Sequence, residues 1–126
     1  MIKILISDDI KIIRDSLEEI IKKINKVELV GSVKSLEEEL EMIEKFKPDL
    51  VLTDIVKDGK EKILKAVKEH SDKKSNTKFI FITGMDKEYV RYQIAKNKLD
   101  NVVGIVHKPF IEQEIINIVN AVSIKN

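Results

Sequence analysis

The 126-residue sequence predicts an α/β fold in which helices cover both faces of a parallel β-sheet. Two observations lead to this prediction. Short apolar runs rich in branched residues alternate along the chain with stretches of helical periodicity, which is the order of a strand–helix repeat. The apolar runs are also nearly continuous, as expected of strands buried on both faces. The pattern occurs five times, so we expect five parallel strands and five helices.

The elements follow one another in a regular order. The predicted strands are Ile2–Ser7, Glu28–Ser32, Leu50–Thr53, Phe79–Thr83 and Val102–His107. The apolar stripes that mark the five helices begin at Ile13, Leu36, Ile63, Val90 and Ile111. The polar stretch Ser71–Lys78 is predicted to be a surface loop, and His70 before it is expected to be exposed.

The second helix has the clearest start signal. Ser35 and Glu38 have the spacing of a capping box, in which each side chain satisfies a backbone N–H at the helix start. The acidic run Glu37–Glu39 is interpreted as solvated surface. The predicted apolar stripe of this helix consists of Leu36, Leu40 and Ile43.

Composition narrows the class of protein. Residues 1–126 suit one domain with a sizeable core. Charged residues make up 36% of the chain, yet the net charge is only +1, so neither a nucleic-acid groove nor a membrane-binding face is indicated. There is no cysteine, and the first apolar run is too short for a membrane span. We expect a cytoplasmic protein, and no output domain after the fifth helix.

Side chains able to take part in chemistry follow four of the five predicted strands. The carboxyl ends of parallel strands meet at one edge of a sheet, where open sheets bind ligands. The residues at these four strand ends are Asp8, Asp9, Asp54, Thr83, Gly84, Lys108 and Pro109. Taken singly, the aspartates are equally consistent with helix caps. Unrelated caps would not fall on so many ends of one edge, so the set indicates a functional site.

The residue types at this edge suit phosphoryl transfer. Three adjacent carboxylates cannot all stay ionised unaided, and Mg²⁺, which prefers oxygen ligands, would remove the conflict. A carboxylate can also act as the nucleophile and form an aspartyl phosphate. Lys108 would supply positive charge, Thr83 a hydrogen bond and Gly84 an unobstructed backbone N–H to the transferring group.

Four motifs in this order resemble the receiver domain of two-component response regulators (CheY-like). They are the "DD" of Asp8-Asp9, "DLVLTDI" around Asp54, "ITG" around Thr83 and "HKPF" around Lys108. The resemblance covers essentially the whole chain. It implies a flavodoxin-like fold, a doubly wound three-layer sandwich with a five-stranded parallel sheet in the order 2-1-3-4-5.

The resemblance also implies a role for each acidic residue. Asp54 would be the phosphoacceptor. Asp9 would bind Mg²⁺ directly and Asp8 largely through water, with Asp54 and the backbone carbonyl of Val56 completing the ligands.

The same resemblance assigns the phosphoryl-binding and switch residues. Thr83 would move toward the phosphoryl group and Lys108 would pair with it. Pro109 follows a peptide bond that is cis in many receivers. Many receivers also carry an aromatic residue three positions before the lysine, where this sequence has Ile105. The usual aromatic switch is therefore absent, and we expect a packed aliphatic contact at Ile105 to take its place.

The loop after the phosphoacceptor departs from the family pattern. Receivers usually carry a loop here that contains Met-Pro and ends in glycine, whereas this chain has Asp58 at the proline position. Gly59 is expected to keep the turn. Lys57 adds a cation, and we hypothesise that it affects Mg²⁺ affinity or phosphoryl lifetime.

The function implied is phosphorylation-dependent signalling rather than turnover catalysis. A sensor histidine kinase or phosphotransfer protein would phosphorylate Asp54, docking near Ile10 and Ile12. The change would be read on the face of the fourth helix, fifth strand and fifth helix by a downstream protein, an attached output domain or a second copy in a phosphorylation-dependent homodimer. The domain itself would not bind nucleic acid. It is either a stand-alone receiver or the N-terminal part of a longer transcription regulator.

Two alternatives from other classes stay open at this point. An Asp-nucleophile phosphatase would typically have a second aspartate two residues after the nucleophile, where this chain has Ile10 or Val56. A small flavin- or nucleotide-binding protein of similar topology would need a glycine- or hydroxyl-rich loop after the first strand, where this chain is acidic.

Overall fold

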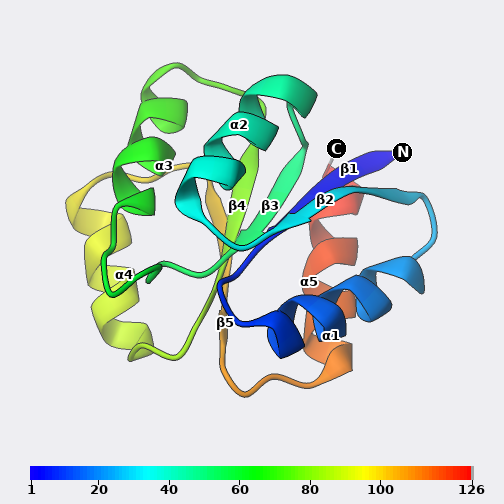
Figure 1. The fold of residues 1–126 in the computed structure, drawn as a ribbon. Coiled ribbons are helices and arrows are strands. Elements are labelled where there is room, and N and C mark those ends of the chain that lie inside the picture. The colour runs from blue at the N-terminus through cyan, green and yellow to red at the C-terminus, as the bar shows by residue number, and fades with distance from the viewer. Residues whose placement is uncertain (126) are drawn as a thin grey trace.

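A computed structural model describes the backbone of residues 1–125 and the side chains of residues 1–122, and it shows a three-layer α/β sandwich (Figure 1). Five parallel strands form one sheet in the order β2-β1-β3-β4-β5. The strands are β1 (Ile2–Ser7), β2 (Val27–Val33), β3 (Leu50–Thr53), β4 (Lys78–Thr83) and β5 (Val102–His107). The helices are α1 (Lys11–Lys22), α2 (Leu36–Phe46), α3 (Ile63–Asp72), α4 (Lys87–Lys96) and α5 (Glu112–Lys125). The predicted fold class and strand order are confirmed.

The two faces of the sheet have separate cores. Side chains alternate along each strand, so Ile4 and Ile6 of β1 point to one face and Leu5 points to the other. The first face packs against α1 and α5, which contribute residues such as Leu17 and Val119. The second packs against α2, α3 and α4 (Figure 1). Burial on both faces explains why β1, β3 and β4 are apolar almost throughout.

The register of the central strands brings the functional edge together. Ser7 at the end of β1 pairs with Thr53 at the end of β3, so both strands stop at the same level. The backbone N–H of Asp54 donates to the carbonyl of Ser7 over 3.1 Å, and the N–H of Lys108 donates to the carbonyl of Thr83 over 2.8 Å. Parallel pairing thus continues for one residue beyond the strands and holds the site residues side by side.

Element boundaries differ from the prediction in two places. Strand β2 extends one residue beyond the predicted range at each end. The predicted loop at 71–78 is shorter than expected, because α3 continues through Asp72 and β4 begins at Lys78. His70, expected to be exposed, is instead partly buried with its ring 5.9 Å from that of Phe79.

The predicted stripe of α2 is wrong by one position. Ser35 is confirmed as the N-cap, since the Glu38 N–H donates to its hydroxyl over 3.1 Å, but the Glu38 carboxylate accepts from the Ser35 hydroxyl over 3.0 Å and not from the Ser35 backbone N–H. However, Leu40 is 39% exposed, and Glu39, expected on the surface, is fully buried. The helix therefore turns Leu36, Glu39 and Ile43 toward the core, which is an equally good helical spacing that places a carboxylate inside.

None of the helices within residues 1–125 combines the length and the apolar character that a membrane span requires.

Candidate functional site

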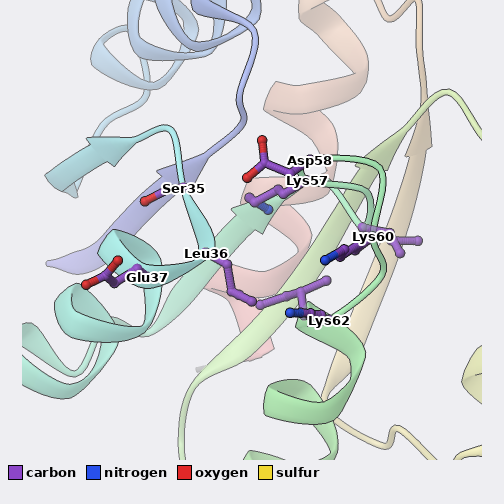
Figure 2. Close-up of a pocket in the computed structure, with 9 residues that line it drawn as sticks. Ser35, Leu36, Glu37, Lys57, Asp58, Lys60 and Lys62 are labelled. Carbon is purple, nitrogen blue, oxygen red and sulfur yellow. The ribbon is translucent and has the colours of Figure 1, made fainter.

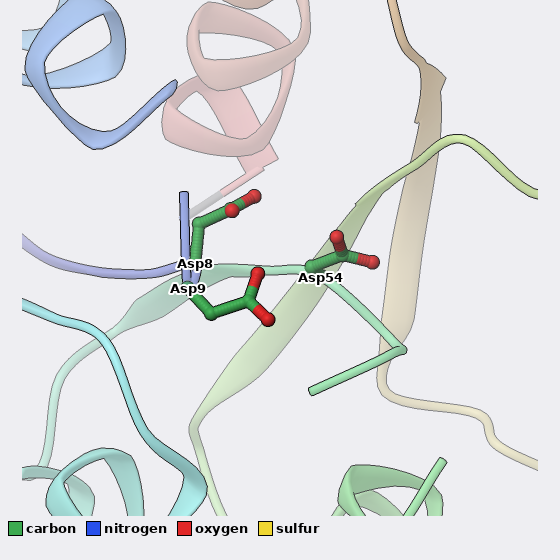
Figure 3. A group of neighbouring side chains, drawn as sticks. All are labelled: Asp8, Asp9 and Asp54. Atoms are coloured by element: carbon green, nitrogen blue, oxygen red, sulfur yellow. The ribbon is translucent and has the colours of Figure 1, made fainter. Parts of the chain in front are cut away.

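The acidic residues predicted to form a site lie together at the carboxyl edge of the sheet (Figure 3). One carboxylate oxygen from each of Asp8, Asp9 and Asp54 lies within 4.8 Å of the others. Asp8 and Asp54 are buried, with 1% and 8% of their surface exposed, whereas Asp9 is exposed. Three oxygen donors at this spacing form a set that can hold a hard divalent cation.

Lys108 joins the two buried carboxylates. Its ammonium lies 2.7 Å from Asp8 Oδ2 and 2.8 Å from Asp54 Oδ2. Partial burial acts to lower the pKa of Lys108, but its hydrogen bonds to Asp54 and Asp8 and their charges outweigh this, so the pKa is raised. The side chain is therefore a permanent cation at neutral pH. The peptide bond between Lys108 and Pro109 is cis.

Backbone donors fix the orientation of both buried carboxylates. The N–H of Ile10 donates to Asp8 Oδ1 over 2.9 Å, and the N–H of Val56 donates to Asp54 Oδ1 over 3.1 Å. Arg14, which the sequence prediction did not include, donates from α1 to the backbone carbonyl of Asp8 over 2.8 Å. Each aspartate therefore presents a defined oxygen toward the common space between them.

The fourth strand ends at Thr83 and is followed by Gly84, and the carbonyl of Thr83 accepts from the backbone N–H of Lys108 over 2.8 Å. Thr83 is fully buried, and its hydroxyl accepts a hydrogen bond from the N–H of Met85 over 3.1 Å. A Cβ added at Gly84 would meet no heavy atom within 4 Å among the described residues other than Gly84 itself and its two chain neighbours. The backbone at this position is therefore open.

Ile105 is partly buried beside the second core. It pairs with Phe81 across β4 and β5 and packs against the cluster that includes Val90. Tyr89 reaches away to the loop after β3, where its hydroxyl donates to Glu61 Oε1 over 3.0 Å.

The loop after Asp54 is a tight two-residue turn. The N–H and C=O groups of Lys57 and Lys60 bond to each other in both directions, over 2.9 and 3.0 Å. Asp58 and Gly59 between them both have positive φ, of 53° and 71°. This is the geometry of an Asp-Gly type I′ turn. Asp58, at the position where proline was expected, is the first central residue of this turn, and Gly59 is the second.

Lys57 forms no ion pair with the carboxylates of the acidic cluster among the described residues; its partner is a residue that the sequence prediction placed on the surface. Its ammonium lies 3.1 Å from Glu39 Oε1 of α2, and both residues are buried. It also donates to the Thr53 hydroxyl over 2.8 Å and to the backbone carbonyl of Asp54 over 2.6 Å. The sequence does contain one indication of this pair: Glu39 lies on the same face of the predicted helix as the apolar residues Leu36 and Ile43.

Burial raises the pKa of the Glu39 carboxyl, and the positive charge of Lys57 opposes this rise. The hydroxyl of Ser7 donates to Glu39 Oε1 over 2.9 Å, so the ends of α2, β1 and β3 meet at this carboxylate. The pair therefore lies directly beneath the loop that follows Asp54.

The strand order, the acidic cluster and the position of Lys108 agree with what the resemblance to receiver domains implies. Residues 4–120 match the family model described as the response regulator receiver domain. The chain belongs to that family.

Relatives of known name are similar over most of this chain. It is 30% identical over 118 residues to the sensory transduction protein LytT of Bacillus anthracis and 29% identical to LytT of Bacillus cereus. These alignments cover 92% of this chain but only 45% of each relative. The chain thus spans somewhat less than half the length of these curated relatives.

Solved structures agree in fold. A DNA-binding response regulator of the LuxR family from Staphylococcus aureus superposes with a TM-score of 0.83 at 22% identity, covering 97% of this chain and 98% of that chain. The response regulator domain of CheB from Thermotoga maritima gives a TM-score of 0.77 at 23% identity, covering 98% and 94%. At these identities the likeness establishes the fold alone.

Proposed function

We propose that this domain accepts a phosphoryl group on Asp54 from a sensor histidine kinase or a phosphotransfer protein. The observation that supports this most directly is the bridge that Lys108 forms between Asp8 and Asp54, with Asp9 beside them. In the transfer, an oxygen of the Asp54 carboxylate forms a bond to phosphorus. The bond from phosphorus to the donor's imidazole nitrogen breaks, and that nitrogen keeps the electron pair.

The donor set fits Mg²⁺, which prefers oxygen ligands and is usually held by one or two carboxylates. Asp9, Asp8 and Asp54 would hold the ion, together with the carbonyl of Val56. When bound, Mg²⁺ supplies positive charge to the oxygens of the transferring group. Lys108 already lies at the Asp54 carboxylate and would neutralise further charge there, while Thr83 and Gly84 would donate hydrogen bonds.

The partners are proposed from the surfaces around this edge. Ile10 and Ile12 are 47% and 75% exposed at the start of α1, next to Asp8 and Asp9, and would contact the phosphodonor. The face formed by α4, β5 and α5 would carry the output, with Ile105 beneath it in place of the usual aromatic residue. Its readers would be a downstream protein, an output domain or a second copy of this domain, with no direct contact to nucleic acid.

The full protein is proposed to be a cytoplasmic signalling protein, as response regulators generally are. The greater length of the LytT relatives supports a form in which the receiver is joined to an output domain. The length of the natural open reading frame distinguishes this form from a stand-alone receiver. The family match over residues 4–120 favours the receiver over a phosphatase or a flavin-binding protein.

Intact-mass analysis after incubation with acetyl phosphate and Mg²⁺ tests the proposal. The wild type should gain one phosphoryl group, and Asp54→Asn should gain none. EDTA should prevent the gain. A wild-type chain that stays unmodified, or an Asp54→Asn chain that is still modified, would contradict the assignment of Asp54.

A further inference from the structure

The buried pair Glu39–Lys57 is a feature of this chain that the proposed phosphoryl chemistry does not use. A buried ion pair rarely repays its desolvation cost, and apolar residues of similar volume often serve stability as well. Here the cost is also incompletely offset, because Glu39 Oε2 is buried with no hydrogen-bond partner among the described residues. Stability alone therefore does not account for these two residues.

The contacts of Lys57 indicate what the pair does instead. Its ammonium holds the backbone carbonyl of Asp54 at 2.6 Å and the hydroxyl of Thr53 at 2.8 Å, and Glu39 holds the ammonium from α2 at 3.1 Å. The residues tied down are the phosphoacceptor itself and the last residue of β3. Val56, whose carbonyl is proposed as a Mg²⁺ ligand, lies in the two-residue link between Asp54 and Lys57.

The loop needs such an anchor on its α2 side. A cavity of about 240 Å³ separates the loop from the start of α2, and it is lined by residues that include Ser35, Leu36 and Lys60. Figure 2 shows Lys57 over the end of β3, whereas Lys60 and Lys62 lie farther along the loop. Side-chain packing is therefore incomplete between the loop and α2. On this side, the loop is held by the charged contacts of Lys57.

We propose that Glu39 and Lys57 are positioning residues that hold the loop after Asp54 in the geometry required to bind Mg²⁺. The inference rests on the proposed function, because it assigns a role toward the same metal. It also refines the hypothesis that Lys57, as an added cation, affects Mg²⁺ affinity, because the ammonium acts through its contacts with the loop. Partners behind a metal ligand commonly change metal affinity by an order of magnitude or more when they are removed.

The direction in which Lys57→Met changes Mg²⁺ affinity distinguishes a positioning role from simple charge repulsion. If Lys57 only repelled the metal, Lys57→Met would bind Mg²⁺ more tightly. A positioning role predicts roughly tenfold weaker binding, because the loop loses its anchor. The dissociation constant is measured from amide NMR shifts during a Mg²⁺ titration. Lys60→Met, which removes an exposed cation from the same loop, is the matched control and should bind Mg²⁺ within about twofold of wild type.

The double variant Glu39→Met/Lys57→Met separates positioning from stability. It removes both charges, leaves the net charge unchanged and fills the space with apolar atoms, so it should fold even if Lys57→Met alone does not. We expect urea unfolding close to that of wild type, with Mg²⁺ binding still roughly tenfold weaker and a changed lifetime of the phosphorylated form. Mg²⁺ binding equal to wild type in the double variant, or tighter binding in Lys57→Met, would overturn the inference.

These outcomes are distinct from failure of the proposed function. A wild-type chain that neither binds Mg²⁺ nor gains a phosphoryl group contradicts the proposed function itself. A wild-type chain that does both, with the double variant indistinguishable from it, contradicts only the role of Glu39 and Lys57.

Discussion

At the scale of single residues, Lys108 makes the acidic cluster compatible with folding. Two buried carboxylates would repel each other, and the Lys108 ammonium within 2.8 Å of both offsets that repulsion. Its pKa is raised in the folded state, so its contribution to stability is complete at all pH values below the ordinary lysine pKa of 10.5. That contribution is lost only as the pH rises through the folded pKa. Lys108 is therefore a constant charge under physiological conditions.

His70 is the residue from which we expect a pH effect. Burial and, to a lesser degree, the nearby Lys73 lower its pKa below the ordinary value of 6.5. A lowered histidine pKa contributes stability above 6.5 that is lost as the pH falls through the folded pKa. The free energy of unfolding from urea titrations at about pH 7.5 and about pH 5 should therefore fall less in His70→Leu than in wild type. Equal losses in the two proteins would show that His70 carries none of the acid sensitivity.

Substitutions at Gly84 should change the rate of phosphorylation without preventing folding. No described atom lies within 4 Å of a Cβ at this position, so Gly84→Ala should change the free energy of unfolding by less than about 0.5 kcal/mol. Gly84→Leu should also fold but fill the space proposed for the phosphoryl group. We expect its initial rate of phosphorylation by acetyl phosphate to fall roughly tenfold or more. A Gly84→Leu protein that is modified as fast as wild type would place the phosphoryl group elsewhere.

At the scale of elements, the sequence predicted the strands well because β1, β3 and β4 are buried on both faces, and the edge strands β2 and β5 are still partly buried. Continuous apolar runs identified all five, and three of them with their observed boundaries. Helix α2 was harder, since Leu40 and Glu39 are neighbours and hydrophobicity alone favours burying the leucine. The helix buries Glu39 because Lys57, eighteen residues later, supplies the partner charge. The periodicity of one helix can indicate that Glu39 faces the core, but it cannot indicate which distant residue pairs with it.

The turn at Asp58-Gly59 gives a prediction about the loop as an element. Gly59 has φ of 71°, and a Cβ there would meet no described atom within 4 Å, so only backbone conformation opposes a side chain. Gly59→Ala should therefore lower the free energy of unfolding by about 1 kcal/mol, and Gly59→Asn by less, because asparagine tolerates this conformation better. Urea unfolding measures both. Gly84 lacks a positive φ and serves as the comparison. If Gly59→Ala were no more destabilising than Gly84→Ala, the assignment of a type I′ turn would be contradicted.

At the scale of the whole molecule, the site is a consequence of parallel topology. Residues from positions 8 to 108 meet because β1, β3, β4 and β5 run in one direction and end at one edge (Figure 1). That rule is general, so the sequence alone predicted that the three aspartates and Lys108 would gather there. It did not predict the support beneath them, namely Arg14 on the Asp8 carbonyl and the Glu39–Lys57 pair. Those contacts depend on how the helices and loops pack against the sheet, which the strand order alone does not determine.

The same topology predicts that Mg²⁺ stabilises the entire fold. The three carboxylates come from two strand ends and are close together only in the folded chain, so an ion bound by them favours folding. A concentration of Mg²⁺ ten times its dissociation constant should add about 1.4 kcal/mol to the free energy of unfolding, and EDTA should remove the gain. Asp9→Asn should lose most of it, while the exposed Asp15→Asn in α1 should keep it, at an ionic strength matched with NaCl. If Asp9→Asn and Asp15→Asn gained equally, the ion would be bound outside the acidic cluster, since general screening affects both variants alike.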